Sequence, residues 1–384
     1  MNFAKQSINL HRKLKGKIEI KSKVKVDNLN ALSLAYTPGV AAPCSLIAKK
    51  PNESFSLTAR GNLVAVITDG SAVLGLGNIG PTAGIPVMEG KCVLFKAFAN
   101  INAFPLCLNT QKTDEIINII KALEPSFAAI NLEDISAPRC FVIEEQLKQE
   151  LSIPIMHDDQ HGTAIVVAAA LINAIKVAHK QKGKLKIVIS GAGAAGIAIA
   201  KLLLLMEFGN VVMVDKVGIL NKNNSTLPSH HLNIAQLTNK NNESGTLKDA
   251  MKNADVFIGV SIGNIVSLKM AKSMNKNAIV FAMANPLPEI LPEIATAAGV
   301  KVMGTGRSDF PNQINNALVF PGMFRGTLDA KAKQITAAMK IAAVNALASL
   351  VTKNKLKPNY VIPSILDKRV VPAIAKAVAK ASRR

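Results

Sequence analysis

Aromatic residues are scarce in this chain of 384 residues, which contains no tryptophan and two tyrosines. Aromatic side chains are what proteins use to stack against exposed bases, so their scarcity argues against a nucleic-acid binder. The formal net charge of +21 would favour anionic partners in general. However, the lysines are spread over the whole chain and accompany no recognition motif. We therefore expect no nucleic-acid partner and interpret the charge as a lysine-rich surface.

Cysteine and long hydrophobic runs are also in short supply. The four cysteines, Cys44, Cys92, Cys107 and Cys140, have no C-x-x-C spacing, which argues against both a zinc site and a disulfide framework. The apolar run at 163–175 is shorter than the roughly 18 residues that span a bilayer, and the N-terminus lacks the apolar core of a signal peptide. These absences predict a cytoplasmic protein with reduced thiols and no membrane segment.

Four carboxylates flank one helical segment in the first half of the chain. Residues 128–132 and 153–156 are short apolar runs typical of buried strands, and 137–151 between them has helical spacing. Such a unit makes a right-handed crossover between parallel strands, so the acids after each strand meet at one sheet edge. These acids are Glu133, Asp134, Asp158 and Asp159. Because converging carboxylates repel one another, the pattern predicts a hard divalent cation; the alternative is that two acidic loops merely cap helices.

A glycine-rich turn in the second half of the chain predicts dinucleotide binding. We expect a strand at 186–190 and a helix at 194–206, with a G-x-G-x-x-G pattern between them. The residues of this pattern are Gly191, Ala192, Gly193, Ala194, Ala195 and Gly196. The next strand, 210–215, ends in Asp215 at the spacing of an acid that binds ribose. Asp215 favours NAD, whereas Lys216 beside it could partly neutralise the extra phosphate of NADP, so both cofactors stay open.

Strand and helix patterns alternate along the chain and predict an α/β fold with two domains. Further strands are expected at 255–260, 278–283 and 300–304, and alanine-rich helices close the chain. We expect an N-terminal α/β domain at 1–160 that carries the substrate and metal residues. A Rossmann-type dinucleotide-binding domain with C-terminal helices should follow at 161–384.

Single residues outside these motifs are also candidates. A helix is expected at 88–99, where Lys91 would lie near the helix start and the positive end of the dipole would disfavour its ammonium form. With a metal ion nearby, such a lysine could act as a base. Tyr36 stands before a Pro-Gly turn in an apolar stretch. Asn285 follows a predicted strand, and Asn316 lies in a stretch rich in amides that suit carboxylate binding.

Nine motifs, in order along the chain, resemble those of malic enzymes. They are YTPGVA, LGLGNIGP, MEGK, LFKAFA, INLEDISAPRCF, HDDQHGTA, GAGAAG, ANP and NNALVFPG, and the resemblance covers essentially everything from His11 onward. The chain is most similar to the short prokaryotic form, because Ala72 stands where longer relatives have a substrate-binding arginine.

The resemblance implies oxidative decarboxylation of malate to pyruvate and carbon dioxide, with reduction of NAD or NADP and a requirement for Mg²⁺ or Mn²⁺. It implies that Tyr36 is the general acid, that Lys91 is the general base and that Asp158 supports the proton network. It also implies a homodimer, in which Tyr36 could reach the active site of a partner subunit. The implied metal ligands are Glu133, Asp134 and Asp159, and the implied substrate contacts are Lys91, Asn285 and Asn316.

Two departures from the family pattern and two alternative functions complete the expectations. Asn102 and Asn109 stand where the family generally has aspartate, and we assign neither a catalytic role. One alternative is another metal- and NAD-dependent dehydrogenase, acting on tartrate or a different 2-hydroxy acid, against which YTPGVA and MEGK argue. The other is a non-enzymatic binder of nucleotides or nucleic acid, which only the charge suggests.

Overall fold

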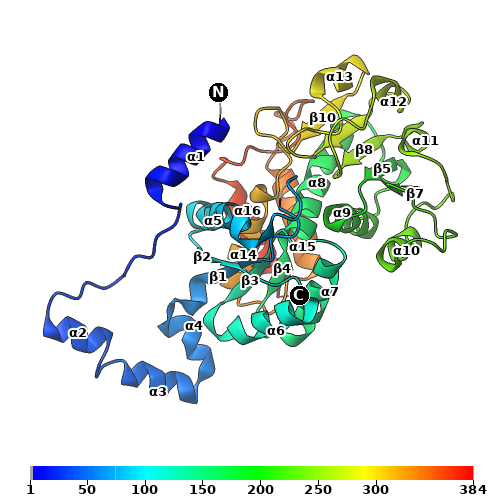
Figure 1. Ribbon diagram of the computed structural model, residues 1–384. Helices are drawn as coiled ribbons and strands as arrows, with labels where there is room; N and C mark the ends of the chain where they lie inside the picture. The colour runs from blue at the N-terminus through cyan, green and yellow to red at the C-terminus, as the bar shows by residue number, and fades with distance from the viewer. Residues whose placement is uncertain (1–2, 74, 384) are drawn as a thin grey trace.

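The structure, a computed structural model, describes residues 3–73 and 75–383, which form two largely parallel sheets packed with helices (Figure 1). The first sheet has the order β2-β1-β3-β4, and every neighbouring pair is parallel. Its strands are β1 (Leu63–Thr68), β2 (Asn102–Cys107), β3 (Ala129–Leu132) and β4 (Ile155–His157). The helices between them are α5 (Gly80–Ala99), α6 (Thr113–Leu123) and α7 (Arg139–Glu150).

The second sheet has the order β10-β9-β8-β5-β6-β7, in which β7 alone pairs antiparallel among the described strands. Its strands are β5 (Lys186–Ser190), β6 (Asn210–Asp215), β7 (Gly218–Ile219), β8 (Val256–Gly259), β9 (Ile279–Ala282) and β10 (Val302–Thr305). Helices α9 (Ala194–Leu205), α10 (Ser229–Ala235), α11 (Leu247–Met251), α12 (Leu268–Lys272) and α13 (Pro292–Ala297) connect them. The predicted α/β class and its Rossmann-type second half are confirmed.

Helix α8 (Asp158–Val177) joins the two sheets and is the centre of the molecule. By length and composition it could cross a membrane, but 72% of its apolar window is buried inside the fold, as expected of a core helix. Of the C-terminal helices, α14 (Phe320–Asp329) packs against α5, α15 (Ala337–Ser349) packs against α8, and α16 (Val370–Ala381) packs against α14 and α15. One apolar core therefore runs through both halves, and the predicted domain boundary at 160/161 falls inside the first turn of α8.

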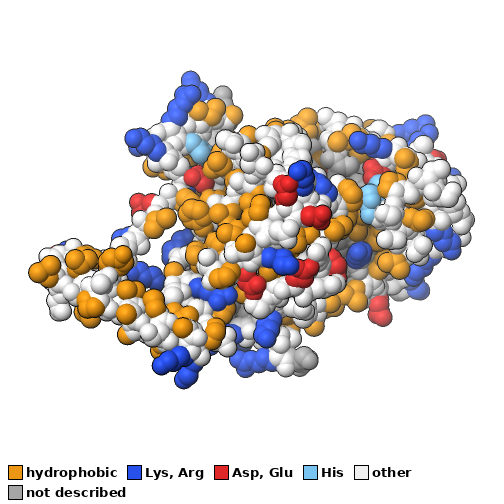
Figure 2. Space-filling view, turned by 60° about the horizontal axis from the view of Figure 1, so that its bottom comes forward, with side chains coloured by type: hydrophobic (Ala, Val, Ile, Leu, Met, Phe, Trp, Pro, Cys, Tyr) orange, Lys and Arg blue, Asp and Glu red, His pale blue; other side chains and the backbone are white. Residues whose placement is uncertain are grey.

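The N-terminal arm, residues 3–50, extends from this body (blue, at the left of Figure 1). Helices α1 (Phe3–Leu14), α2 (Leu29–Ala35) and α3 (Ala41–Lys49) contain no buried residue. Apolar side chains are nevertheless numerous on the arm and gather on the face seen in Figure 2. A short helix, α4 (Ser54–Leu57), then leads into β1. The arm thus exposes the kind of surface that proteins normally cover.

The predicted strands agree with the structure to within one or two residues, but one helix is longer than predicted. Helix α5 begins at Gly80, eight residues before the predicted start at Met88. Glycine and proline residues in this segment disfavour a helix locally, but Pro81 lies in the first turn, where proline is tolerated, and Pro86 is accommodated inside the helix. The buried face of α5, which includes Met88 and Phe95, overrides the local preference.

Phe95 should be critical for stability because its ring contacts Phe320 and Phe324 edge-on and so joins α5 to α14. Phe95→Ala would leave a cavity in a fully buried position and should lower the free energy of unfolding by about 3–5 kcal/mol. Chemical denaturation followed by circular dichroism measures the change. The control is Phe104→Ala, at a position that is 38% exposed, and equal losses for the two variants would contradict the assignment.

Candidate active site

Strands β3 and β4 bring the two acidic pairs to one sheet edge. The two strands are parallel neighbours with Leu132 opposite His157, so the residues that follow each strand lie side by side. Helix α8 begins at Asp158, which places Asp158 and Asp159 in the first helical turn. Negative charge is favoured there by the helix dipole. The predicted convergence of the carboxylates is therefore present in the structure.

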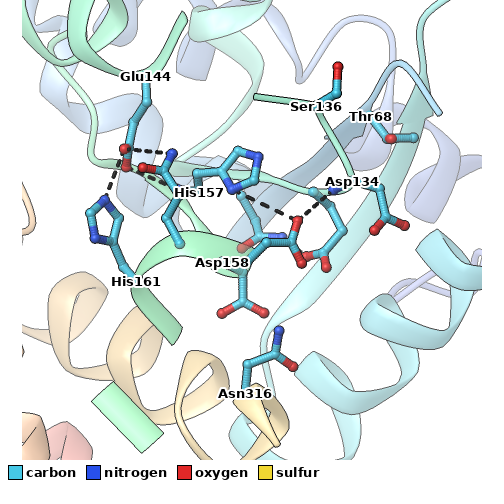
Figure 3. Close-up of polar contacts among 12 residues, drawn as sticks. Thr68, Asp134, Ser136, Glu144, His157, Asp158, His161 and Asn316 are labelled. Carbon is cyan, nitrogen blue, oxygen red and sulfur yellow. Dashed lines mark hydrogen bonds and ion pairs between the residues drawn. The ribbon is translucent and has the colours of Figure 1, made fainter. Parts of the chain in front are cut away.

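Lys91 is held in this cluster by contacts from three elements. Its Nζ lies 2.6 Å from Asp158 Oδ2 and 3.0 Å from Glu133 Oε1. It also donates a hydrogen bond of 3.3 Å to Asn316 Oδ1, from the short helix at Asn316–Leu318 (Figure 3 labels Asp158 and Asn316). Asn131, which precedes Glu133 by two residues, donates to Glu133 Oε2 at 3.0 Å. The arrangement unites a buried cation, two carboxylates and two amides.

The predicted reason for an unusual Lys91 pKa is wrong. Because α5 starts at Gly80, Lys91 lies in the middle of this helix and not near the positive end of its dipole. Burial would lower the pKa of Lys91, but the negative charges of Asp158, Glu133 and Asp159 outweigh it and raise the pKa above its usual value. The nearest proton acceptor is Asp158, where burial raises the carboxyl pKa to about 7.

Glu133, Asp134 and Asp159 form a site that fits a divalent cation. One oxygen of each lies within 4.8 Å of the others. The site is shaped by the backbone, because Asp134 has a left-handed φ of 53° and its N–H donates to Asp159 Oδ2 at 2.8 Å. Three carboxylates suit Mg²⁺ or Mn²⁺ because hard cations prefer oxygen ligands. Burial, followed by repulsion from Asp159, raises the pKa of Glu133 to about 7, which a bound cation would counteract.

The cluster requires a glycine at position 162, which the sequence patterns did not single out. A Cβ at this position would lie 1.9 Å from Asp158 Oδ1 and 3.1 Å from Asn316 Cβ. A side chain here would therefore force Asp158 or Asn316 away from Lys91. The signal was present, because this glycine lies inside the motif HDDQHGTA within an otherwise regular helix.

The glycine-rich turn between β5 and α9 has the geometry of a dinucleotide site. Gly191 has a φ of 106°, and a Cβ there would lie 2.6 Å from Val260 O. A Cβ on Gly196 would lie 1.8 Å from Gly191 O, so this glycine permits close packing of α9. Gly193 has no atom within 4 Å of its Cβ position among the described residues, which leaves a bare backbone for a pyrophosphate to approach. The remaining residues of the predicted turn, Ala192, Ala194 and Ala195, lie between these glycines.

Asp215 ends β6, beside the glycine-rich turn as predicted. Its Oδ2 lies 3.4 Å from Nε2 of His231, which also contacts Ala192 O at 3.1 Å. The backbone N–H of Lys216 donates to Asp215 Oδ1. A carboxylate at this edge is suited to a ribose hydroxyl.

Two predicted site residues lack contacts with the Lys91 cluster. Asn285 follows β9 with an exposed side chain that donates to Met283 O at 3.5 Å. Its loop nevertheless borders the first domain, because a Cβ on Gly75 would lie 2.0 Å from Asn285 O. Tyr36 ends α2 on the N-terminal arm, where it is 67% exposed and touches none of the described catalytic candidates. A single chain therefore does not bring Tyr36 to Lys91.

Comparisons with known proteins agree with these features. A family model described as malic enzyme, N-terminal domain, matches residues 15–148, and one described as malic enzyme, NAD binding domain, matches residues 160–383. The bifunctional malic/malolactic enzyme of Bacillus subtilis is 55% identical, covering 100% of this chain and 93% of the relative. The NAD-dependent malic enzyme of Geobacillus stearothermophilus is 51% identical, with 100% and 80% covered. A crystal structure of an NAD-dependent malic enzyme from Thermotoga maritima superposes with a TM-score of 0.94 at 48% identity, covering 97% of this chain and 98% of that one.

The carboxylate cluster predicts that stabilisation by Mn²⁺ depends on pH. Because burial raises the pKa of Glu133 and Asp158 to about 7, their stabilising contribution in the metal-free protein is present below the unfolded values and is lost as pH rises through about 7. Binding of Mn²⁺ requires the deprotonated ligands, so the rise in Tm caused by Mn²⁺ should grow from about pH 6 to about pH 8.

Differential scanning fluorimetry at a series of pH values measures this change in Tm. Glu133→Gln is the control, since it removes one ligand charge and should abolish most of the Mn²⁺ effect. A rise in Tm that is the same at every pH, or that persists in Glu133→Gln, would contradict the site.

Proposed function

Since the chain belongs to the malic enzyme family, whose members are decarboxylating malate oxidoreductases, we propose that it converts malate to pyruvate and carbon dioxide. The proposed reaction takes place in the cytoplasm and uses a divalent cation bound by Glu133, Asp134 and Asp159. The observation that carries the proposal is the position of Lys91, which is buried between Asp158 and Glu133, one of the proposed metal ligands. NAD or NADP would accept the hydride from C2 of malate, and Mg²⁺ or Mn²⁺ would supply Lewis-acid stabilisation of the negative charge that develops on the 2-oxygen.

Lys91 and Asp158 are the proposed acid–base pair for oxidation. Malate loses a hydride from C2 and a proton from the 2-hydroxyl, and Lys91 is the group that would take this proton. It must be neutral to do so, yet the surrounding carboxylates favour its ammonium form. Asp158, at 2.6 Å, is the acceptor that can relieve Lys91 of its proton beforehand. Asn316 beside Lys91, and Asn285 from the other domain, would hold the substrate carboxylates without adding charge.

Decarboxylation and protonation complete the proposed reaction. The bond between C3 and the distal carboxylate breaks, carbon dioxide leaves, and the electron pair stays on the product as an enolate. Protonation at C3 then gives pyruvate, and Tyr36 is the proposed donor. Because Tyr36 lies on the N-terminal arm, away from Lys91 of its own chain, we propose that it serves the active site of a second copy.

The arm itself supports a homodimer. Ile20 and Leu29 are 88% and 81% exposed, and Leu34, in the helix that ends at Tyr36, is 73% exposed. A second copy of the chain would bury these side chains and receive Tyr36 together with them. The base of the arm is already fixed, because the Lys17 backbone N–H donates to Glu89 Oε2 of α5 at 3.1 Å.

The first test is an assay of pyruvate and carbon dioxide formation from malate with Mn²⁺, using NAD and NADP side by side. Asp159→Ala should lower turnover by about 100-fold or more, because one cation ligand is lost. It should leave NAD binding unchanged, as measured by calorimetry. Wild-type turnover in Asp159→Ala would contradict the assignment of Asp159 as a metal ligand. Reduction of the cofactor without release of carbon dioxide, or a faster reaction with tartrate than with malate, would favour a different 2-hydroxy-acid dehydrogenase.

The second test asks whether Tyr36 acts across the dimer. Tyr36→Phe and Lys91→Ala should each be nearly inactive alone. After dissociation and reassociation of a mixture, activity should return to about a quarter of the wild-type value, because about half of the dimers are mixed and each contains one intact site.

Reassociation of either variant with itself is the control and should restore nothing. A mixture that stays as inactive as its components would contradict the shared site and leave Tyr36 to act within its own chain.

A further inference from the structure

Glu144 of α7 is a buried carboxylate that the proposed chemistry does not use. It is 3% exposed and points toward the first turn of α8 (Figure 3). Its Oε1 accepts the backbone N–H of His157 at 3.0 Å, and its Oε2 contacts His161 Nε2 at 2.9 Å. Gln160 Nε2 at 3.3 Å and Lys148 Nζ at 3.0 Å complete its polar contacts among the described residues. One side chain thus collects contacts from three residues of a single turn.

These contacts enclose the two acids on which the site depends. His157 immediately precedes Asp158 and Asp159, and Gln160 and His161 immediately follow them. Glu144 therefore holds the backbone N–H that precedes the acidic pair and two side chains that follow it, without contacting either carboxylate. A peptide turn held at both ends has little freedom to rotate, so the directions of the two carboxylates are set by a residue on another helix.

A second contact connects the same turn to the C-terminal helices. Lys340 of α15 lies with its Nζ 2.9 Å from His161 Nδ1. An ammonium can only donate, so Nδ1 accepts and Nε2 carries the hydrogen that is donated to Glu144. Although burial opposes it, the hydrogen bond from His161 and the positive charges of Lys148 and Lys340 keep the pKa of Glu144 below its usual value, and the carboxylate stays ionised. The network Glu144–His161–Lys340 thus spans α7, α8 and α15.

The network borders a cavity of about 820 Å³ between α7, α9 and α15. Glu144, His161 and Lys340 all line it, beside apolar residues such as Ile197 and Leu202. Because this cavity has room for water, a substitution in the network can be rehydrated and need not prevent folding. In Figure 3, Glu144 and His161 lie on the opposite side of Asp158 from Asn316, which contacts Lys91 in the catalytic cluster.

We propose that Glu144 is a positioning residue that sets the affinity of the carboxylate site for its divalent cation, by fixing the turn that carries Asp159. The proposal rests on the metal site of the proposed function. Outer partners of this kind typically change metal affinity or activity by about 10- to 100-fold when they are removed. Lys340 acts one step further away through His161, so its loss should have a smaller effect in the same direction.

The test compares Glu144→Gln with Glu145→Gln, the same substitution at the next position, which is exposed. Dissociation constants for Mn²⁺ are measured from the electron paramagnetic resonance signal of the free ion, on the complete protein without substrate. Glu144→Gln should weaken Mn²⁺ binding by about 10- to 100-fold, and Glu145→Gln should bind like the wild type. In turnover assays, the apparent KM for Mn²⁺ should rise more than kcat falls, and binding of NAD should be unchanged.

A purely structural role would give a different result. A lower Tm for Glu144→Gln with wild-type affinity for Mn²⁺ would overturn the proposal. If Glu144→Gln does not fold, Lys340→Met serves as the second test. It should weaken Mn²⁺ binding several-fold, and wild-type affinity of Lys340→Met for Mn²⁺ would also overturn the proposal. Failure of the metal site itself is distinguishable, because then the wild type would not bind Mn²⁺ or Asp159→Ala would bind it equally well.

Discussion

A buried ammonium among buried carboxylates is the interaction on which the rest of this structure depends. Lys91 contacts Asp158 and Glu133 at a point where Asp158 is inaccessible to solvent and Glu133 nearly so. Charges of this kind are costly to bury and are tolerated only when each is paired and hydrogen-bonded. Beyond the ion pairs, Asn131 donates a hydrogen bond to Glu133 and Asn316 accepts one from Lys91, while the absence of a side chain at Gly162 leaves room for Asp158. The fold thus gathers Lys91, Glu133 and Asp158 at one buried place, where their electrostatic coupling is strong.

Helix α8 makes this placement possible because it belongs to both halves of the molecule. Its first turn carries Asp158 and Asp159 at the edge of the first sheet, and its long apolar body packs against α9 and α15. The segments that follow the second sheet return across the core, so that Asn316 contacts Lys91 and Lys340 contacts His161 in the first turn of α8. The proposed metal ligands and the glycine-rich turn are thereby held in one continuous core.

Sequence patterns predicted the parts that follow from local periodicity. The apolar runs around β3 and β4 and the helix between them required parallel pairing, and pairing required the acids to converge. The G-x-G-x-x-G turn likewise has the three separate glycine roles that its spacing implies. The start of α5 was predicted incorrectly, because glycine and proline in its first turns outweighed a buried face that only the assembled core reveals. With that start, the dipole argument for Lys91 failed as well.

By itself the sequence determined the fold class, the meeting of the acidic residues that follow β3 and β4 at one sheet edge, and the family resemblance. These follow from periodicity and spacing, which are properties of residues close together in the chain. Tertiary structure decided the burial, the contacts and the pKa values of those residues. It placed Lys91 in the middle of a helix among carboxylates that raise its pKa, left Tyr36 on an exposed arm, and set Glu144 behind the acidic turn. Each of these depends on contacts between residues far apart in the chain, and burial and electrostatic coupling across such contacts cannot be read from spacing alone.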